Sequence, residues 1–167
     1  MSYTPKYLGH VNMYVRNAER SRDWYEDLLG LHTYAVREGR AAFMCADLDQ
    51  SHEIALVQVG DDAPGPEKGR VGLNHMAWRM ESLDDLKELY HRIREKEVDI
   101  YQISDHGISL GIYITDPDGN GIEVYYELPR SEWPAKIFGG ETMAQGKFPG
   151  PWDEWMAERK EKVAARV

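Results

Sequence analysis

The feature that most constrains the fold is a pattern that occurs twice along the chain. The two copies superpose when one histidine is placed on another, and the surrounding residues then match in type. The matched pairs are His10 with His75, Asn17 with Ser82, Tyr25 with Tyr90, and Leu28 with Ile93. A chain of 167 residues is long enough for one domain. The repeat therefore predicts one domain built from two similar modules.

Both copies follow the same order of expected elements. A strand is followed by a residue suited to cap a helix, then by the helix and three shorter strands. In the first copy we expect these elements over residues 7–15, 17–29, 32–37, 41–46 and 52–59. In the second copy we expect them over residues 72–80, 82–97, 99–103, 108–115 and 121–127. Each copy is therefore expected to form a βαβββ module.

This order predicts an α+β fold in which paired βαβββ modules form an open, cupped barrel. We expect the modules over about residues 5–60 and 70–128, joined by a polar linker rich in proline and glycine. Residues 1–128 would then form one domain, and residues 129–167 a C-terminal extension that is irregular at first and helical from Pro151 to Ala165. Such an extension either covers the cup, docks onto a partner chain or lies on the surface.

Composition and charge exclude several classes of protein. A net charge of −9 would repel a phosphate backbone, so we expect no nucleic-acid partner. The apolar runs fall short of the roughly 20 residues that span a bilayer, so no membrane partner is expected. The first residues lack the apolar region of a signal peptide and Cys45 is the single cysteine, which favours the cytoplasm. Sheet edges that need covering favour a homo-oligomer.

Three polar residues lie opposite the apolar side of three expected strands. Side chains alternate between the two faces of a strand. In the first, fifth and last expected strands, the side chains opposite the apolar face include His10, His75 and Glu123 respectively. In a cupped sheet, the side turned away from the helices is the concave one. We therefore expect these three side chains on the concave face.

Two imidazoles and one carboxylate suit a divalent ion such as Fe(II), and Mn(II) accepts the same ligands. Such a set occupies three coordination positions and leaves others open for a substrate and O2. A single histidine is more often a hydrogen-bonded polar residue than a metal ligand. Two histidines at equivalent positions of a repeat, together with a glutamate after a sharp turn, favour the metal site instead.

Two further segments carry polar residues in a specific order. The first starts with His106 and Gly107, continues through Tyr113 and a turn of sequence Asp-Pro-Asp-Gly-Asn, and ends at Glu123. The second runs from Ser51 through a histidine and a glutamate into the apolar residues of an expected strand.

Together these features resemble the vicinal oxygen chelate superfamily over about residues 7–127. That superfamily includes glyoxalase I, fosfomycin-resistance proteins, methylmalonyl-CoA epimerase and the type I extradiol dioxygenases. The segment from His106 to Glu123 resembles the signature of the extradiol, or catechol 2,3-, dioxygenases in a small single-domain form. Ser104 is a minor departure, because the family usually carries another small or β-branched residue there. The segment from Ser51 resembles the strand start that bears the family's acid–base histidine.

The resemblance implies paired modules with metal ligands on the concave face. The implied Fe(II) ligands are His10, His75 and Glu123. The resemblance also implies that His52 is the acid–base residue, and that His106 and Tyr113 line the substrate site. The implied reaction opens the ring of a catechol-type aromatic diol beside its two hydroxyls and incorporates both atoms of O2.

A different metalloenzyme on the same scaffold is the main alternative, such as a glyoxalase, an epimerase or a thiol transferase. These enzymes usually take a fourth protein ligand, for which Glu53 is a candidate. His52 and Glu53 are neighbours on an expected strand and should face opposite ways. A His52 that faces the cleft favours the dioxygenase, whereas a metal-bound Glu53 favours the alternative.

A third possibility is a binding module that holds its ligand without a metal. Such a module has no use for two histidines and a glutamate at ligand positions. The substrate itself stays open, since monocyclic catechols, biphenyl-type diols and fused-ring diols all fit the pattern.

Overall fold

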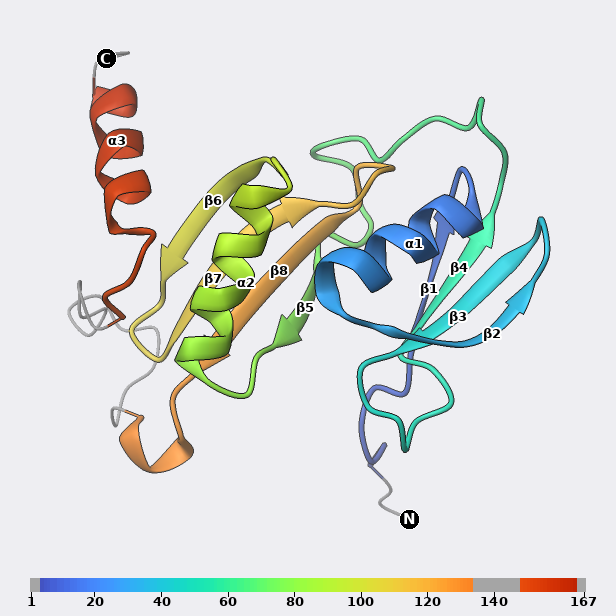
Figure 1. Cartoon of the computed structure of the whole chain (residues 1–167), viewed down its shortest axis with the longest axis horizontal. Helices are drawn as coiled ribbons and strands as arrows, with labels where there is room; N and C mark the ends of the chain where they lie inside the picture. Colours follow the sequence, from blue (N-terminus) through green and yellow to red (C-terminus); the bar gives the residue numbers. More distant parts are fainter. Residues whose placement is uncertain (1–3, 134–147, 165–167) are drawn as a thin grey trace. The chain divides into compact units, whose positions relative to one another are not determined.

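The computed structural model describes residues 4–133 and 148–164. It divides into two compact units, the first comprising Met1–Arg70 with Asp116–Gly119, and the second Val71–Thr115 with Asn120–Val167. Each unit contains one βαβββ module (Figure 1). The α+β class and the two modules are therefore confirmed, while the pairing of the two sheets and the bounds of a single domain over residues 1–128 stay predictions.

The first unit is a four-stranded sheet with one helix against it. Its elements are β1 (Val11–Val15), α1 (Ala18–Leu29), β2 (His32–Arg37), β3 (Ala41–Cys45) and β4 (Ile54–Gln58). The strand order is β1-β4-β3-β2, and β1 runs parallel to β4 while the other pairs are antiparallel. The core lies between α1 and the sheet, where Met13, Leu28, Met44, Ile54 and Leu56 are buried.

Helix α1 begins and ends where the sequence provides caps. The side chain of Asn17 accepts hydrogen bonds from the backbone amides of Glu19 and Arg20. Gly30 ends the helix with a φ of 70°, a conformation that glycine adopts at little cost. Tyr25 and Leu28 are buried on the side of α1 that faces the sheet.

The second unit repeats this arrangement. Its module consists of β5 (Met76–Arg79), α2 (Leu83–Glu95), β6 (Ile100–Asp105), β7 (Ser109–Thr115) and β8 (Gly121–Glu127), in the sheet order β5-β8-β7-β6. Ser82 and Asp85 form a capping box at the start of α2. A short 3-10 helix, Arg130–Glu132, and α3 (Asp153–Ala164) follow the module.

The turn Asp116–Gly119, between β7 and β8, groups with the first unit. The carboxylate of Asp118 is nearly buried and accepts hydrogen bonds from the side chains of Arg16, Arg20 and Ser21. The backbone amide of Arg16 donates to the same carboxylate at 3.1 Å. Burial of Asp118 opposes ionisation, but the hydrogen bonds from Arg20 and Arg16 outweigh it and hold the pKa of this carboxyl below its usual range.

The described part of the C-terminal extension packs against the second unit. Trp152 is fully buried, with its ring centroid 6.0 Å from that of Tyr90 on α2. The indole nitrogen of Trp152 donates to the carbonyl of Phe148 at 2.8 Å, and the Phe148 ring lies 6.1 Å from that of Tyr126. The extension from Phe148 onward therefore contributes to the core of this unit. Most of the expected irregular arm, residues 134–147, lies outside the described residues.

Several elements are shorter than the sequence pattern suggests. Strands β1, β4 and β5 begin at Val11, Ile54 and Met76, rather than at residues 7, 52 and 72. Strand pairing begins only where a partner strand lies alongside. The first pair between β1 and β4 is Val11 with Ile54, and the first pair between β5 and β8 is Met76 with Ile122. Alternating polarity does not carry this information. Histidines 10, 52 and 75 therefore precede their strands instead of lying within them.

Within residues 4–133 and 148–164, no helix is both long and apolar enough to cross a membrane.

Candidate metal centre and its surroundings

In each unit, one face of the sheet packs on the helix and the other is turned away from it (Figure 1). Tyr113 on β7 is the direct cross-strand neighbour of Glu123 on β8, and Ala77 on β5 flanks Glu123 from the other side. The neighbours of Glu123 along β8, Ile122 and Val124, are fully buried on the helix side. Strand alternation therefore directs Glu123 and Tyr113 to the face turned away from α2.

His75 and Glu123 form a close pair on this face. The Nε2 atom of His75 lies 3.1 Å from Oε2 of Glu123. The other ring nitrogen, Nδ1, lies 2.6 Å from the side-chain oxygen of Asn74. An amide oxygen can only accept a hydrogen bond, so the Nδ1 atom of His75 is the donor. A neutral imidazole with its proton on Nδ1 carries a lone pair on Nε2 that points toward the glutamate, whereas an imidazolium donates from Nε2 to the same carboxylate.

This pair suits a divalent cation. A nitrogen lone pair and a carboxylate oxygen that face each other are two electron donors, and a cation between them would satisfy both. Metal ligands stand about 2.1 Å from a small divalent ion, so two of them at a right angle are about 3 Å apart. The observed separation of His75 Nε2 and Glu123 Oε2, 3.1 Å, fits this arrangement. Asn74 fixes the imidazole orientation in the way that outer hydrogen-bond partners of metal ligands do.

Two glycines leave room for the pair. A β-carbon at residue 111 would overlap with the carboxylate of Glu123, and a β-carbon at residue 121 would overlap with the carbonyl oxygen of Asn74. Gly111 therefore leaves the space that the carboxylate occupies, and Gly121 lets β8 approach the segment that carries His75.

Tyr113 and His106 extend the polar cluster. The Tyr113 hydroxyl lies 3.1 Å from Nε2 of His106, and its ring is 5.4 Å from that of His75. Burial, a hydrogen bond to Glu123 and the charge of that carboxylate raise the pKa of Tyr113 well above its ordinary value. The phenol therefore stays protonated and can act as a hydrogen-bond donor.

In the first unit, His10 and His52 lie side by side. Their ring centroids are 4.5 Å apart, and the ring of Phe43 meets that of His52 edge-on at 5.3 Å. Regular alternation along β4 would put His52 on the helix side with Ile54. The chain bends at Glu53, just before β4 begins, and the His52 ring lies against His10 instead.

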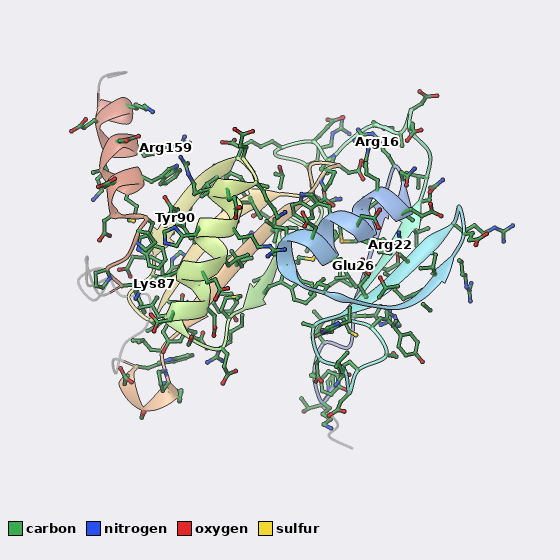
Figure 2. The ribbon with its side chains drawn as sticks, in the orientation of Figure 1. Arg16, Arg22, Glu26, Lys87, Tyr90 and Arg159 are labelled. Atoms are coloured by element: carbon green, nitrogen blue, oxygen red, sulfur yellow. The ribbon has the colours of Figure 1, made fainter. Side chains whose placement is uncertain are left out.

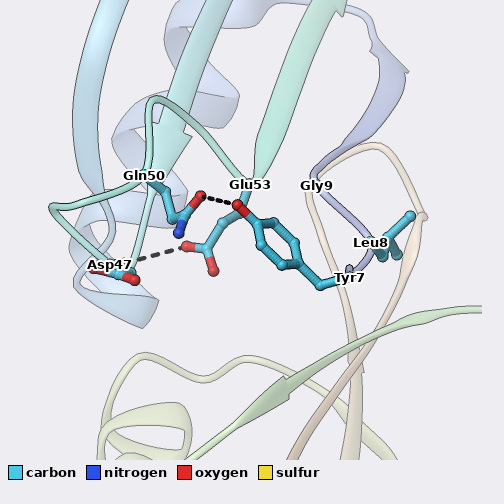
Figure 3. Close-up of a pocket in the computed structure, with 6 residues that line it drawn as sticks. All are labelled: Tyr7, Leu8, Gly9, Asp47, Gln50 and Glu53. Carbon is cyan, nitrogen blue, oxygen red and sulfur yellow. Dashed lines mark hydrogen bonds between the residues drawn. The ribbon is translucent and has the colours of Figure 1, made fainter. Parts of the chain in front are cut away.

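Glu53 has a different environment. Its carboxylate accepts hydrogen bonds from the backbone amides of Ala46 and Asp47, at 2.6 and 3.2 Å. It also lines a small pocket of about 130 Å³ whose other lining residues are Tyr7, Leu8, Gly9, Asp47 and Gln50 (Figure 3). Its hydrogen bonds thus tie Glu53 to the loop after β3, and its environment differs from that of His52.

The structure brings together His75, Glu123, Tyr113 and His106 in the second unit, and His10 with His52 in the first. Among the residues that the structure describes, no group of three or more His, Cys, Asp or Glu side chains is gathered as a metal site. Because His10 belongs to a different unit from His75 and Glu123, the meeting of all three ligands stays a prediction.

Sequence patterns alone missed Asn74, Gly111 and Phe43. Asn74 directly precedes His75, and Gly111 stands two residues before Tyr113 on the same strand, so adjacency to a site residue was the available signal. Phe43 is identified only by its contact with His52.

Several named proteins are similar in sequence to this chain. Biphenyl-2,3-diol 1,2-dioxygenase 2 of Rhodococcus globerulus is 30% identical over 124 residues, which are 74% of this chain and 64% of that protein. Catechol-2,3-dioxygenase of Bacillus subtilis is 29% identical over 82% of this chain and 47% of that protein. The chain thus spans less than two thirds of the length of these dioxygenases. The metallothiol transferase FosB of Staphylococcus haemolyticus is 25% identical over 72% of this chain and 83% of its own.

Solved structures with the same fold are more distant in sequence. A glyoxylase/bleomycin resistance protein/dioxygenase domain from Frankia sp. EAN1pec has a TM-score of 0.62 at 22% identity and covers 74% of this chain and 93% of its own. Lactoylglutathione lyase from Agrobacterium tumefaciens has a TM-score of 0.59 at 21% identity, with 74% and 96% covered. The family model of the Glyoxalase/Bleomycin resistance protein/Dioxygenase superfamily matches residues 7–124. The chain therefore belongs to this superfamily.

Proposed function

We propose that this protein is an Fe(II)-dependent extradiol dioxygenase that opens the ring of a catechol-type aromatic diol with O2. The observation that carries the proposal is the contrast between two sequence neighbours. The imidazole of His52 lies against that of His10, whereas the carboxylate of Glu53 is held by backbone amides. An acid–base histidine beside a ligand suits a dioxygenase. Relatives that are named dioxygenases of biphenyl-2,3-diol and catechol support the same activity.

The residues that would hold the ion are His10, His75 and Glu123. A bound ferrous ion would supply positive charge, which lowers the pKa of the diol hydroxyls, and vacant positions at which the diol and O2 are held together. Mn(II) is the second ion that this donor set accepts. Metal analysis of protein purified without added metal distinguishes the two.

His52 would move the protons of the reaction. A neutral imidazole can take the proton from a diol hydroxyl and later return one to the opening ring. The hydroxyl of Ser51 lies 3.1 Å from Nδ1 of His52, so it can hold the ring while Nε2 exchanges the proton.

Tyr113 and His106 would orient the diol. The raised pKa of Tyr113 keeps its phenol protonated, so it can donate a hydrogen bond to a substrate oxygen. His106 lies within hydrogen-bond distance of that phenol and would set the direction of its proton.

We also propose that the protein acts as a homo-oligomer in the cytoplasm. Each sheet has two edge strands, β1 and β2 in the first unit and β5 and β6 in the second, and exposed edges are usually covered. Light scattering on the purified chain measures the number of subunits.

A glyoxalase-like or thiol-transferase-like metalloenzyme is the alternative, and a pair of variants separates it from the dioxygenase. His52→Ala should retain the metal but lower turnover of catechols about 100-fold, because proton transfer typically contributes that much. Glu53→Gln should retain the metal and most turnover, since the amide oxygen still accepts from the loop. His32→Ala, at an exposed histidine of β2, is the matched control for which no change is expected.

The opposite pattern would favour the alternative: loss of metal in Glu53→Gln with full turnover in His52→Ala. A purified protein without any divalent metal at near-stoichiometric level would instead support a metal-free binding module.

A further inference from the structure

Strand β6 contains an irregularity on the face that carries the candidate metal ligands. The pairing of β6 with β7 shifts register between Ile100 and Gln102. Ile100 and Ile103 are both buried, at 3% and 8% exposure, although regular alternation would place them on opposite faces. Two consecutive residues, Tyr101 and Gln102, therefore lie outside the helix-side core. A β-bulge of this kind re-aims a side chain.

The bulge directs Tyr101 toward the polar cluster. Its ring centroid is 6.1 Å from that of Tyr113, with the two planes tilted by 48°. Tyr113 in turn contacts His75 and neighbours Glu123. Burial and then the charge of Glu123 raise the pKa of Tyr101 above its ordinary value. Tyr101 is half-buried, so part of its ring stays available to a ligand.

The backbone of the bulge is held from outside the module. Arg159 lies on α3 (Figure 2). Its side chain donates a hydrogen bond to the carbonyl oxygen of Tyr101 at 3.0 Å. The edge position of β6 leaves this carbonyl accessible to such a donor. Residue 159 lies beyond residues 7–124, the part that the family model matches. The extension of this chain therefore contacts the backbone of the residue whose ring lies beside Tyr113.

A tyrosine in this position offers a planar apolar surface to a ligand beside Glu123. Aromatic rings attract one another in tilted and offset geometries, and they contribute a large contact area. A rigid ring next to a binding position also limits the size of what can occupy that side.

We propose that Tyr101 determines which diol the site accepts: its ring forms a wall that contacts a monocyclic catechol and excludes a second ring attached to that side. Tyr101 belongs to none of the motifs that suggested the reaction. The inference rests on the proposed function, since it concerns the substrate of the same site.

The test compares Tyr101→Ala and Tyr101→Phe with a matched control, Tyr34→Ala. Tyr34 occupies the register shift of β2 between Thr33 and Ala35, the counterpart of the β6 bulge in the first unit, and is 64% exposed. Each full-length variant is loaded anaerobically with Fe(II), its metal content is measured, and 4-nitrocatechol is titrated by absorbance. The ratio of kcat/KM for catechol to that for 3-phenylcatechol is then measured with O2.

Tyr101→Ala should raise the Kd for 4-nitrocatechol about tenfold, the scale of a lost aromatic contact. It should lower the preference for catechol over 3-phenylcatechol by a similar factor, with unchanged metal content. Tyr101→Phe keeps the wall and should stay within about twofold of the wild type, as should Tyr34→Ala. If circular dichroism shows that Tyr101→Ala is unfolded, Tyr101→Leu replaces it, with the same direction expected.

If the wild type is active and the alanine or leucine variant keeps the same binding and selectivity, the proposed role of Tyr101 is wrong, while the proposed function is not affected. An equal effect of Tyr101→Phe would also overturn that role, because then the hydroxyl and not the ring would matter. A metal-loaded wild type that neither binds 4-nitrocatechol nor consumes O2 would overturn the proposed function and this inference with it.

Discussion

Gly111 lies directly against the carboxylate of Glu123, so close that any β-carbon at residue 111 would overlap with Oε1. Residue 111 is buried on β7, next but one to Tyr113, and the space that a side chain would take there is filled by the glutamate. The absence of a side chain at one residue therefore sets the position of a candidate ligand on the neighbouring strand.

Gly111→Ala should displace the Glu123 carboxylate and weaken Fe(II) binding at least about tenfold, as loss of support for a metal ligand typically does. An anaerobic Fe(II) titration measures the change. Gly72→Ala is the control, because a β-carbon there meets no atom within 4 Å. Wild-type affinity in a folded Gly111→Ala protein would mean that the observed position of Glu123 is not needed for the ion.

Asn74 should orient His75 through its side-chain oxygen. Asn74→Ala removes the acceptor of the Nδ1 proton, and we expect about a tenfold loss of Fe(II) affinity. Asn74→Asp keeps an acceptor at the same place and should restore most of the binding. The same titration checks both variants. Equal losses in the two variants would contradict an orienting role, because only one of them lacks the hydrogen bond.

The Asp118 carboxylate should stabilise the fold in a pH-dependent way. Asp118→Asn removes a charge that Arg16 and Arg20 contact, and should lower the free energy of unfolding near neutral pH by about 2 kcal/mol. The pKa of Asp118 is depressed in the folded state, so this contribution is present above the unfolded value of about 4 and is lost as pH falls through the folded pKa.

Urea unfolding of wild type and Asp118→Asn, near neutral pH and again in acid, measures the difference. The difference between the two proteins should shrink in acid. Glu67→Gln is the control. Both side chains of the ion pair between Glu67 and Arg70 are exposed, and exposed ion pairs contribute little to the free energy of unfolding. A difference that does not change with pH would contradict the ionic origin of the effect.

Trp152 should be part of the core rather than of a dispensable appendage. Trp152→Ala removes a fully buried indole from its contact with Tyr90, and we expect a loss of about 3 kcal/mol in stability. Trp155→Ala, at a half-buried position of α3, should cost clearly less. Thermal unfolding of the two variants gives the comparison, and similar midpoints would argue against anchoring of the extension through Trp152.

Local signals in the sequence predicted much of the fold. The caps at Asn17 and Ser82, the stop at Gly30 and the bounds of β2 and β8 all follow from residue type and spacing. The starts of β1, β4 and β5 did not, because a strand begins where its neighbour begins, and polarity along one segment does not report on another. The bulge at Tyr101 is hidden for the same reason: it is a property of two paired strands.

The candidate site was likewise predictable only in part from the sequence. The sequence repeat and the motifs singled out His75, Glu123, Tyr113 and His106, which the second unit brings together. The alternation of polar and apolar residues gave no sign that the chain bends before β4 and places His52 against His10. The supporting roles of Asn74 and Gly111 depend on distances of a few ångströms, which composition and spacing cannot express.

We propose that the chain cleaves an aromatic diol with O2 at an iron centre. The most direct measurement is O2 uptake by the full-length chain, purified anaerobically and loaded with Fe(II), on addition of catechol, with the absorbance of the product recorded in parallel. We expect consumption of one O2 for each diol and a yellow ring-opened semialdehyde, both lost in His75→Ala. Bound iron without any O2 uptake on monocyclic, biphenyl-type or fused-ring diols would contradict it.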